Sequence, residues 1–191
     1  MTGRTHDLAA FTALSYIVLT NPLPQMSLAT ALVAFSANMV GGLAPDIDQP
    51  TADLWHRLRG GRIYAKIFTP FFGGHRTISH SLIGIFIFGF IAKEALRLAS
   101  SVLIVNMDIV WTSFMIGYIS HLIMDTFTKE GVPWFFPIPI RLGIPPFSFL
   151  RIKTSGLVEK SFIFPGLLLI NAYLYYTNYQ QVLIFLHEYI K

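Results

Sequence analysis

Histidine and aspartate residues, which are common at catalytic and metal-binding sites, lie at the ends of apolar segments in this chain. His121 and Asp125 are four residues apart, so they share one face of a helix. An imidazole and a carboxylate at that spacing can bind one cation, or can form a hydrogen-bonded pair that ties helices together. The chain has no cysteine, so any metal site must use nitrogen and oxygen ligands. Ionisable residues in an apolar helix are costly and usually functional, which favours the metal site.

A second motif, at residues 75–81, reads His-Arg-Thr-Ile-Ser-His-Ser. His75 and His80 are five residues apart and lie on different faces of a helix, so we expect His75 in a loop and His80 in the first turn. One of them can bind a metal while the other acts as an acid, a base or a phosphate contact. Arg76 carries a planar fork that suits phosphate or carboxylate. The alternative for Arg76 is an interfacial arginine whose head reaches water.

Three further groups of candidates are weaker when taken alone. Asp46 and Asp48 follow Pro45, so one carboxylate can bind a metal while the other supports it, reaches a second ion or serves as a general base. A solvated turn is the alternative, because Pro-Asp is common in turns. His6 is a candidate ligand at the start of the first apolar segment. Glu159, a candidate general base, precedes the last apolar segment, where a carboxylate also favours the helix dipole.

Five apolar segments predict five helices, at residues 5–20, 27–43, 78–98, 102–126 and 161–186. A polar loop, 44–76, and an interfacial loop rich in proline and aromatic residues, 129–160, separate them. Only 13% of the residues are charged, against about 25% in soluble domains. A spanning helix needs about 20 apolar residues. The last three segments reach that length, and the first two either span a thinned bilayer or form a re-entrant pair. We therefore predict an all-α integral membrane helical bundle, with residues 1–191 as a single domain.

An up-and-down bundle places the starts of its odd helices and the ends of its even helices on one face. That face would gather the candidate residues, which are His6, Asp46, Asp48, His75, Arg76, His80, His121, Asp125 and Glu159. Histidine with carboxylate suits Zn²⁺ in a catalytic site that keeps one position open for water. Mn²⁺ and Fe²⁺ are also compatible with these ligand types.

The basic residues are unevenly placed along the predicted bundle. Eleven of the 14 Lys and Arg residues lie on the side of the candidate site, and only Lys93, Arg97 and Lys191 lie on the other. Because positive residues favour the cytoplasmic side, we expect a multi-pass protein of the cell (inner or plasma) membrane with its site facing the cytoplasm. We expect a lipid bilayer as partner and no nucleic acid. No cleaved signal is apparent, so the N-terminus is expected to stay in the mature protein.

The order of these motifs resembles the YdjM-like family of membrane-bound metal-dependent hydrolases. The resemblance runs from His6 to about Glu159 and is most specific at residues 75–81 and 121–125. The ligand order is also similar to that of zinc-dependent phospholipase C and the P1-type nucleases, which are all-helical. This likeness implies a first ion held by Asp46 or Asp48 with His80, His121 and Asp125. It also implies a second ion held by Asp125 and His6.

The chain departs from the zinc-dependent enzymes in one respect. They hold a third zinc with histidines that follow the His-x-x-x-Asp motif, and here no histidine lies between Asp125 and His187. One or two ions are therefore expected.

These observations favour a membrane-bound metal-dependent hydrolase that acts on a phosphoester through a metal-activated water. The substrate would be a phospholipid or another lipid-linked phosphoester, because the site lies at the membrane interface. A metal or ion transporter is the main alternative, with Asn106 and Asp108 as the only polar residues that hint at a path across the bilayer. A structural membrane protein with a vestigial metal site is the other.

Overall fold

The computed structural model describes residues 1–21, 26–52, 55–56, 59, 61–69 and 76–189, and this part of the chain is helical without an extended sheet. Its seven α-helices are α1 (Gly3–Thr20), α2 (Leu28–Leu43), α4 (Gly61–Phe68), α5 (Leu82–Ala99), α6 (Met107–Thr126), α7 (Phe164–Thr177) and α8 (Tyr179–Tyr189). A 3-10 helix, η1 (Ala44–Asp48), continues α2, and a π-helical turn, η4 (Glu159–Ile163), leads into α7. The predicted all-helical bundle is confirmed.

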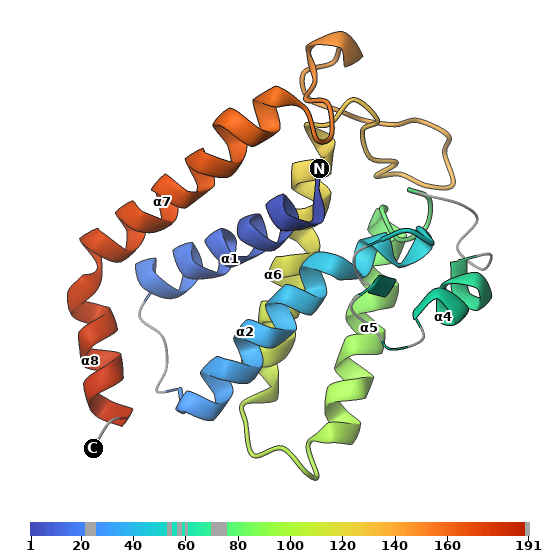
Figure 1. The fold of residues 1–191 in the computed structure, drawn as a ribbon. Helices are drawn as coiled ribbons and strands as arrows, with labels where there is room; N and C mark the ends of the chain where they lie inside the picture. The colour runs from blue at the N-terminus through green and yellow to red at the C-terminus, as the bar shows by residue number, and fades with distance from the viewer. Residues whose placement is uncertain (22–25, 53–54, 57–58, 60, 70–75, 190–191) are drawn as a thin grey trace.

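Helix α6 is the centre of the bundle and packs against α1, α2 and α5. Figure 1 shows α6 passing behind α1 and α2, with α5 on one side and α7 on the other. Helix α7 packs along α1, and α8 continues from it toward the C-terminus. The N-terminus lies beside the end of α6, so the start of α1 and the end of α6 share one end of the molecule.

The helix starts follow from polar side chains that accept hydrogen bonds from the first backbone amides. Ser27 caps α2 by accepting from the amide of Thr30. Ser81 caps α5 through the amide of Gly84, so this helix begins at Leu82 rather than at residue 78. The Asn106 side chain accepts from two amides at the start of α6, which therefore begins at Met107 rather than at residue 102.

Two glycines allow α2 and α6 to touch along their backbones. A Cβ atom at Gly41 would collide with the backbone of Phe114, and one at Gly117 would collide with the carbonyl oxygen of Asn38. The Asn38 side chain adds a hydrogen bond from its amide to the carbonyl of Ser113, 3.1 Å away. This close approach brings the ends of α2 and α6 together, where two of the candidate motifs lie.

The prediction of one helix over residues 161–186 was wrong. The segment is divided into η4, α7 and α8, and α7 contains only 14 residues. The break falls at Asn178, whose side-chain amide donates to the carbonyl of Leu174, 2.9 Å away. Because Asn readily hydrogen-bonds its own backbone, it can end a helix within an apolar run. The segment predicted as a polar loop, 44–76, contains η1 and the amphipathic helix α4.

Two helices of the described chain are long and apolar enough to cross a membrane, Leu28–Asp48 and Met107–Thr126. The second agrees with the prediction, whereas the first is longer than expected because η1 extends α2 to 21 residues. Helix α5 was expected to span comfortably, but it has 18 residues and includes Lys93, Glu94 and Arg97.

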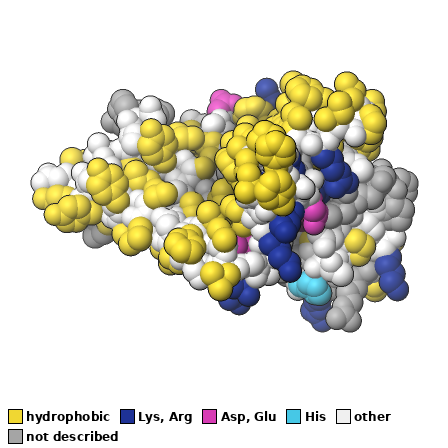
Figure 2. All heavy atoms as spheres, turned by 90° about the horizontal axis from the view of Figure 1, so that it is seen from above, with side chains coloured by type: hydrophobic (Ala, Val, Ile, Leu, Met, Phe, Trp, Pro, Cys, Tyr) yellow, Lys and Arg dark blue, Asp and Glu magenta, His cyan; other side chains and the backbone are white. Residues whose placement is uncertain are grey.

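The outer surface of the bundle is rich in large apolar side chains. Phe86 and Phe90 on α5 are 76% and 66% exposed, and Tyr176 on α7 is 81% exposed. Figure 2, a view from above, shows hydrophobic side chains over much of this face and basic side chains gathered toward its wider end. Soluble monomers rarely expose apolar surface so widely, so this surface suits contact with lipid.

Candidate metal centre

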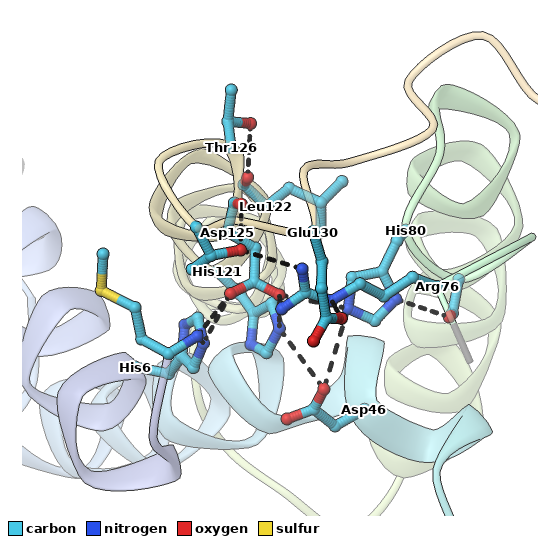
Figure 3. Close-up of polar contacts among 12 residues, drawn as sticks. His6, Asp46, Arg76, His80, His121, Leu122, Asp125, Thr126 and Glu130 are labelled. Atoms are coloured by element: carbon cyan, nitrogen blue, oxygen red, sulfur yellow. Dashed lines mark hydrogen bonds and ion pairs between the residues drawn. The ribbon is translucent and has the colours of Figure 1, made fainter. Parts of the chain in front are cut away.

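Four elements bring the candidate residues to one end of the bundle. They are the start of α1, η1 at the end of α2, the turn before α5, and the last turns of α6 (Figures 1 and 3). These elements carry His6, Asp46, His80 and the His121–Asp125 pair respectively. The structure thus unites the starts of the first and third predicted helices with the ends of the second and fourth, as the up-and-down arrangement requires.

Four donor atoms lie close together between η1, the turn before α5, and α6, and three of their residues, Asp46, His80 and His121, have ligand atoms within 4.8 Å of one another. Oδ1 of Asp46 lies 3.7 Å from Nε2 of His80 and 3.6 Å from Nε2 of His121. Oδ2 of Asp125 lies 3.7 Å from each of the same two nitrogens. Figure 3 shows the two imidazoles and the two carboxylates turned toward one another. We call these four side chains the first donor group.

The spacing and chemistry of the first donor group fit a small divalent cation. Ligands at 2.0–2.2 Å from a tetrahedral zinc ion are separated by roughly 3.3–3.6 Å, close to the separations observed. The buried Nε2 of His121 accepts no hydrogen bond from the described residues. A buried polar atom without a partner is unfavourable, so a ligand at this position would satisfy it.

His121 is oriented by the neighbouring helix. Its Nδ1 atom donates a hydrogen bond to the carbonyl oxygen of Gly42 in α2, 2.7 Å away. A donor proton at Nδ1 leaves the lone pair on Nε2, which faces the first donor group. The close packing of α2 against α6 therefore also sets the tautomer of a candidate ligand.

Asp48 lies behind His80 rather than in the first donor group. Its Oδ2 atom is 3.3 Å from Nδ1 of His80, and it also accepts from the hydroxyl of Ser79 and the amide of Arg76, at 2.5 and 2.9 Å. The Tyr118 hydroxyl donates to the carbonyl of Ser79 at 2.5 Å and fixes this turn against α6. A carboxylate that accepts from the far nitrogen of an imidazole orients a metal-binding histidine. Asp48, which we expected to be a metal ligand or a general base, thus lies where it orients His80.

Burial favours the neutral form of His80. It is the largest influence and lowers the pKa of His80, even though the hydrogen bond to Asp48 acts in the opposite direction. A neutral imidazole has a free lone pair, which is the form that binds a metal.

A second group adjoins the first through Asp125. Nε2 of His6 lies 3.2 Å from Oδ1 of Asp125, and the ring of His6 stacks on that of His121 with centroids 3.7 Å apart. The amino group of Met1 is 2.6 Å from the same carboxylate oxygen and 2.9 Å from Nε2 of His6. Three of these side chains, His6, His121 and Asp125, have ligand atoms within 4.8 Å of one another. Asp125 thus offers one oxygen to each group.

Arg76 is buried and points its guanidinium at the centre. Its Nη2 atom is 2.5 Å from Oδ2 of Asp125, while Nη1 donates to the hydroxyl of Thr128 and the carbonyl of Gly131, at 2.9 and 3.2 Å. Its backbone has a φ of 57°, in the left-handed region that a residue with a side chain seldom adopts. Such conformations persist where surrounding contacts enforce them, and here the carboxylate of Asp48 holds the amide of Arg76. The guanidinium is therefore placed by the fold beside the carboxylate of Asp125.

Glu159 holds the start of α1 in place. Its Oε1 atom accepts hydrogen bonds from the amide and hydroxyl of Thr2 and from the hydroxyl of Thr5, at 2.7–2.8 Å, and Oε2 accepts from the amide of Ser155. Burial alone would raise the pKa of Glu159, but these donors lower it below its ordinary value. The carboxylate is thus engaged by the element that carries Met1 and His6, which gives it a positioning role in place of the general base expected from its sequence position.

His75, the remaining candidate, lies outside the described residues. Sequence reasoning gave no role to the backbone carbonyl of Gly42, to Tyr118 or to Thr128, all of which orient members of the centre. Ser79 was visible only as a fixed member of the motif at residues 75–81. These contacts join residues far apart in the sequence, so spacing alone contained no signal for them.

Comparison with known proteins gives a consistent result. Residues 1–184 match the family model described as YdjM inner membrane protein. The chain is 33% identical over 179 residues to the uncharacterized protein YvsG of Bacillus subtilis (strain 168), which covers 92% of this chain and 95% of that protein. It is 32% identical over 104 residues to the inner membrane protein YdjM of Escherichia coli (strain K12), covering 54% of this chain and 48% of that protein. No solved structure matches the chain.

Proposed function

We propose that this chain, which belongs to the YdjM inner membrane protein family, is a metal-dependent hydrolase that acts on a lipid-linked phosphoester. Family membership confirms the resemblance drawn from the motifs and gives an inner-membrane location. The observation that carries the proposal is the first donor group, in which each of two imidazole nitrogens lies 3.6–3.7 Å from two carboxylate oxygens.

The charge balance of the centre supports a bound cation. Asp48 and Asp125 are almost fully buried, and Asp46 lies largely inside the fold. The guanidinium of Arg76 and the amino group of Met1 supply two positive charges to these three carboxylates. One negative charge remains when the histidines are neutral. Because an uncompensated buried charge is costly, a cation held by the donors would stabilise the folded centre.

Asp46, His80, His121 and Asp125 would hold a first ion. A second ion, at Asp125 and His6, would have to displace the amino group of Met1 from Oδ1 of Asp125 and Nε2 of His6. Zn²⁺ suits this set of nitrogen and oxygen donors, and Mn²⁺ and Fe²⁺ share the same ligand preferences. A divalent cation at such a site supplies Lewis acidity toward a phosphoryl oxygen and makes water more acidic.

The protein residues around the ions would prepare the substrate and the ligands. Asp48 keeps His80 in the tautomer whose Nε2 faces the centre, and the carbonyl of Gly42 does the same for His121. Arg76 would bind the phosphate through Nε and the remaining proton of Nη2, a planar fork that matches phosphate oxygens, and the exposed carboxylate of Glu130, 3.4 Å from Nε, would be displaced. Its contacts with Thr128 and Gly131 hold that fork in a fixed orientation. The site is proposed to face the cytoplasm, on the basis of the basic residues that surround it.

The test combines metal analysis with hydrolysis assays on protein purified in lipid nanodiscs. Wild-type protein is expected to contain Zn, Mn or Fe and to hydrolyse bis(p-nitrophenyl) phosphate or a phospholipid. Both properties should be lost in Asp125→Asn and His121→Ala. Asp108→Asn is a matched control, because Asp108 is exposed in the first turn of α6, far from the centre along the same helix.

Two outcomes would overturn the proposal. One is wild-type protein that is folded but contains none of the three metals. The other is hydrolysis that persists undiminished in Asp125→Asn. Metal uptake into vesicles that is lost in His121→Ala, without hydrolysis, would favour a transporter instead.

A further inference from the structure

A pocket of about 330 Å³ opens beside the metal centre, between the end of α6 and the start of α7. Its walls include Met1, Met124, Phe162, Gly166, Leu167 and Ile170. The residues that line it are apolar or glycine. Ligand pockets in proteins commonly have volumes of 300–1,000 Å³, so this one is large enough for part of a small ligand.

The pocket and the metal centre share a wall. Met1 lines the pocket, and its amino group lies 2.6 Å from Oδ1 of Asp125. Met124 also lines the pocket, and the next residue, Asp125, faces the donors. Successive residues of a helix point about 100° apart, so one turn of α6 presents an apolar side chain to the pocket and a carboxylate to the centre. Met1 and Met124 therefore lie between the pocket and Asp125.

The outer rim of the pocket lies on the apolar surface of the protein. Phe162 and Ile170, at this rim, are 67% and 49% exposed. In an inner-membrane protein such apolar surface faces lipid hydrocarbon rather than water. A chain from the bilayer could enter the pocket sideways without crossing a polar layer.

The backbone around the pocket is shaped in a way that keeps it open. Phe162 and Ile163 belong to the π-helical turn η4, whose first residue, Glu159, is fixed by its hydrogen bonds to Thr2 and Thr5. π-Helical turns are rare and often occur at functional sites. A Cβ atom at Gly166 would meet no heavy atom within 4 Å in the described chain, so the missing side chain leaves space on the pocket wall.

We propose that this pocket binds the hydrocarbon chain of a lipid phosphoester whose phosphate lies at the metal centre. The inference rests on the proposed function for the position of the phosphate. The pocket would supply the affinity for the chain, and the headgroup would reach Asp125 past Met1, which borders both the pocket and the centre. The expected substrate class is thus a phosphate ester with at least one long alkyl or isoprenoid chain.

Photolabelling tests the pocket without requiring turnover. The probe is dodecyl phosphate with a diazirine at its terminal carbon, added with Zn²⁺ to wild-type protein in lipid nanodiscs. Labelled residues are mapped by mass spectrometry, and labelling of the pocket residues Phe162, Ile163, Leu167 and Ile170 is divided by labelling of Phe86 and Phe90. These two phenylalanines are exposed on α5 and report general contact with lipid. Dodecanol with the same diazirine is the control probe without phosphate.

The pocket is expected to be labelled in preference to α5, more strongly by the phosphate probe than by the alcohol. Unlabelled dodecyl phosphate should compete at the pocket but not at α5. Gly166→Leu should lower the labelling ratio at least about fourfold, the loss expected for one buried methylene. Leu168→Phe is the matched control, because Leu168 is half-exposed on the same helix and does not line the pocket.

Equal labelling of pocket and α5, or competition that affects both alike, would refute the pocket and leave only adventitious lipid contact. A ratio in Gly166→Leu equal to that of wild type would refute it as well. If the pocket were labelled in preference to α5 but the protein showed no hydrolysis, the proposed function would be refuted and the binding site for the hydrocarbon chain would stand. Hydrolysis that depends on Asp125, together with uniform labelling, would refute only the chain site.

Discussion

The substitution Asp48→Asn separates two roles that the sequence could not distinguish. Asp48 was a candidate ligand or general base, whereas the structure places its Oδ2 atom 3.3 Å from the far nitrogen of His80. The asparagine keeps the shape of the side chain and one acceptor oxygen but removes the charge. It therefore weakens the control of the His80 tautomer and leaves the first donor group complete.

The size of the expected effect follows from that geometry. Loss of a group that orients a metal-binding histidine typically lowers metal affinity by about 10–100-fold, which corresponds to about 1.4–2.8 kcal/mol. Loss of a donor itself should cost more, because one of the four contacts disappears. Asp46→Asn and Asp125→Asn are therefore expected to weaken binding beyond the range of Asp48→Asn.

The assay is calorimetric titration of metal-free protein in nanodiscs with Zn²⁺, repeated with Mn²⁺. Circular dichroism and thermal melting would establish that each variant is folded, since Asp48 also accepts hydrogen bonds from Ser79 and from the amide of Arg76. Asp108→Asn makes the same chemical change at an exposed position and should leave the affinity unchanged.

Two results would contradict the reasoning. If folded Asp48→Asn lost metal as completely as Asp125→Asn, Asp48 would be a direct ligand and the positioning role would be wrong. If its affinity equalled that of wild type, the carboxylate would not control the state of His80 at all.

Three further predictions concern the framework of the centre. Gly117→Ala should destabilise the protein by about 1–3 kcal/mol and weaken Zn²⁺ binding, because its Cβ meets the carbonyl of Asn38; equal melting temperature and affinity would contradict this. Gly166→Ala, the matched exchange on α7, should instead stabilise the helix by roughly 0.5–1 kcal/mol, measured as a raised melting temperature, since its Cβ enters open space. Glu159→Gln should cost about 1.5–3 kcal/mol at pH 7 by weakening bonds to a charged acceptor. Because the pKa of Glu159 is lowered in the folded state, this stabilisation is present above the ordinary pKa of 4.5 and is lost as the pH falls through the folded pKa. The difference in melting temperature between variant and wild type should therefore disappear in acid. A difference that stays constant from pH 7 to pH 3 would exclude the carboxylate as its source.

The location of the centre was predictable because it depends on the order of helices along the chain. An up-and-down bundle brings together the starts of its odd helices and the ends of its even helices. Those positions carry His6, Asp46, His80 and His121. The apolar segments themselves were visible from composition. Both inferences use information that is local or topological, which a single sequence contains.

The partners within the centre were not predictable, because they depend on distances between side chains that are remote in sequence. Spacing in the sequence could not distinguish the role of Asp46 from that of Asp48. The structure distinguishes them, because it places Asp48 beside Nδ1 of His80, in the turn before α5. Arg76 was recognised as a candidate phosphate ligand, but its contact with Asp125 joins residues 76 and 125. The break at Asn178 was missed for a different reason, since the hydropathy of residues 161–186 is apolar on both sides of it.

The final turns of α6 contain both a glycine that packs against α2 and two residues of the candidate metal centre. Gly117, His121 and Asp125 are four residues apart, so they form a single ridge along the helix. Gly117 lets the backbone of α2 approach, and that approach puts the carbonyl of Gly42 within 2.7 Å of Nδ1 of His121. His121 then faces the first donor group, one turn before Asp125. A larger residue at Gly117 would thus move α2 away from His121 and disturb a proposed metal ligand that it does not touch.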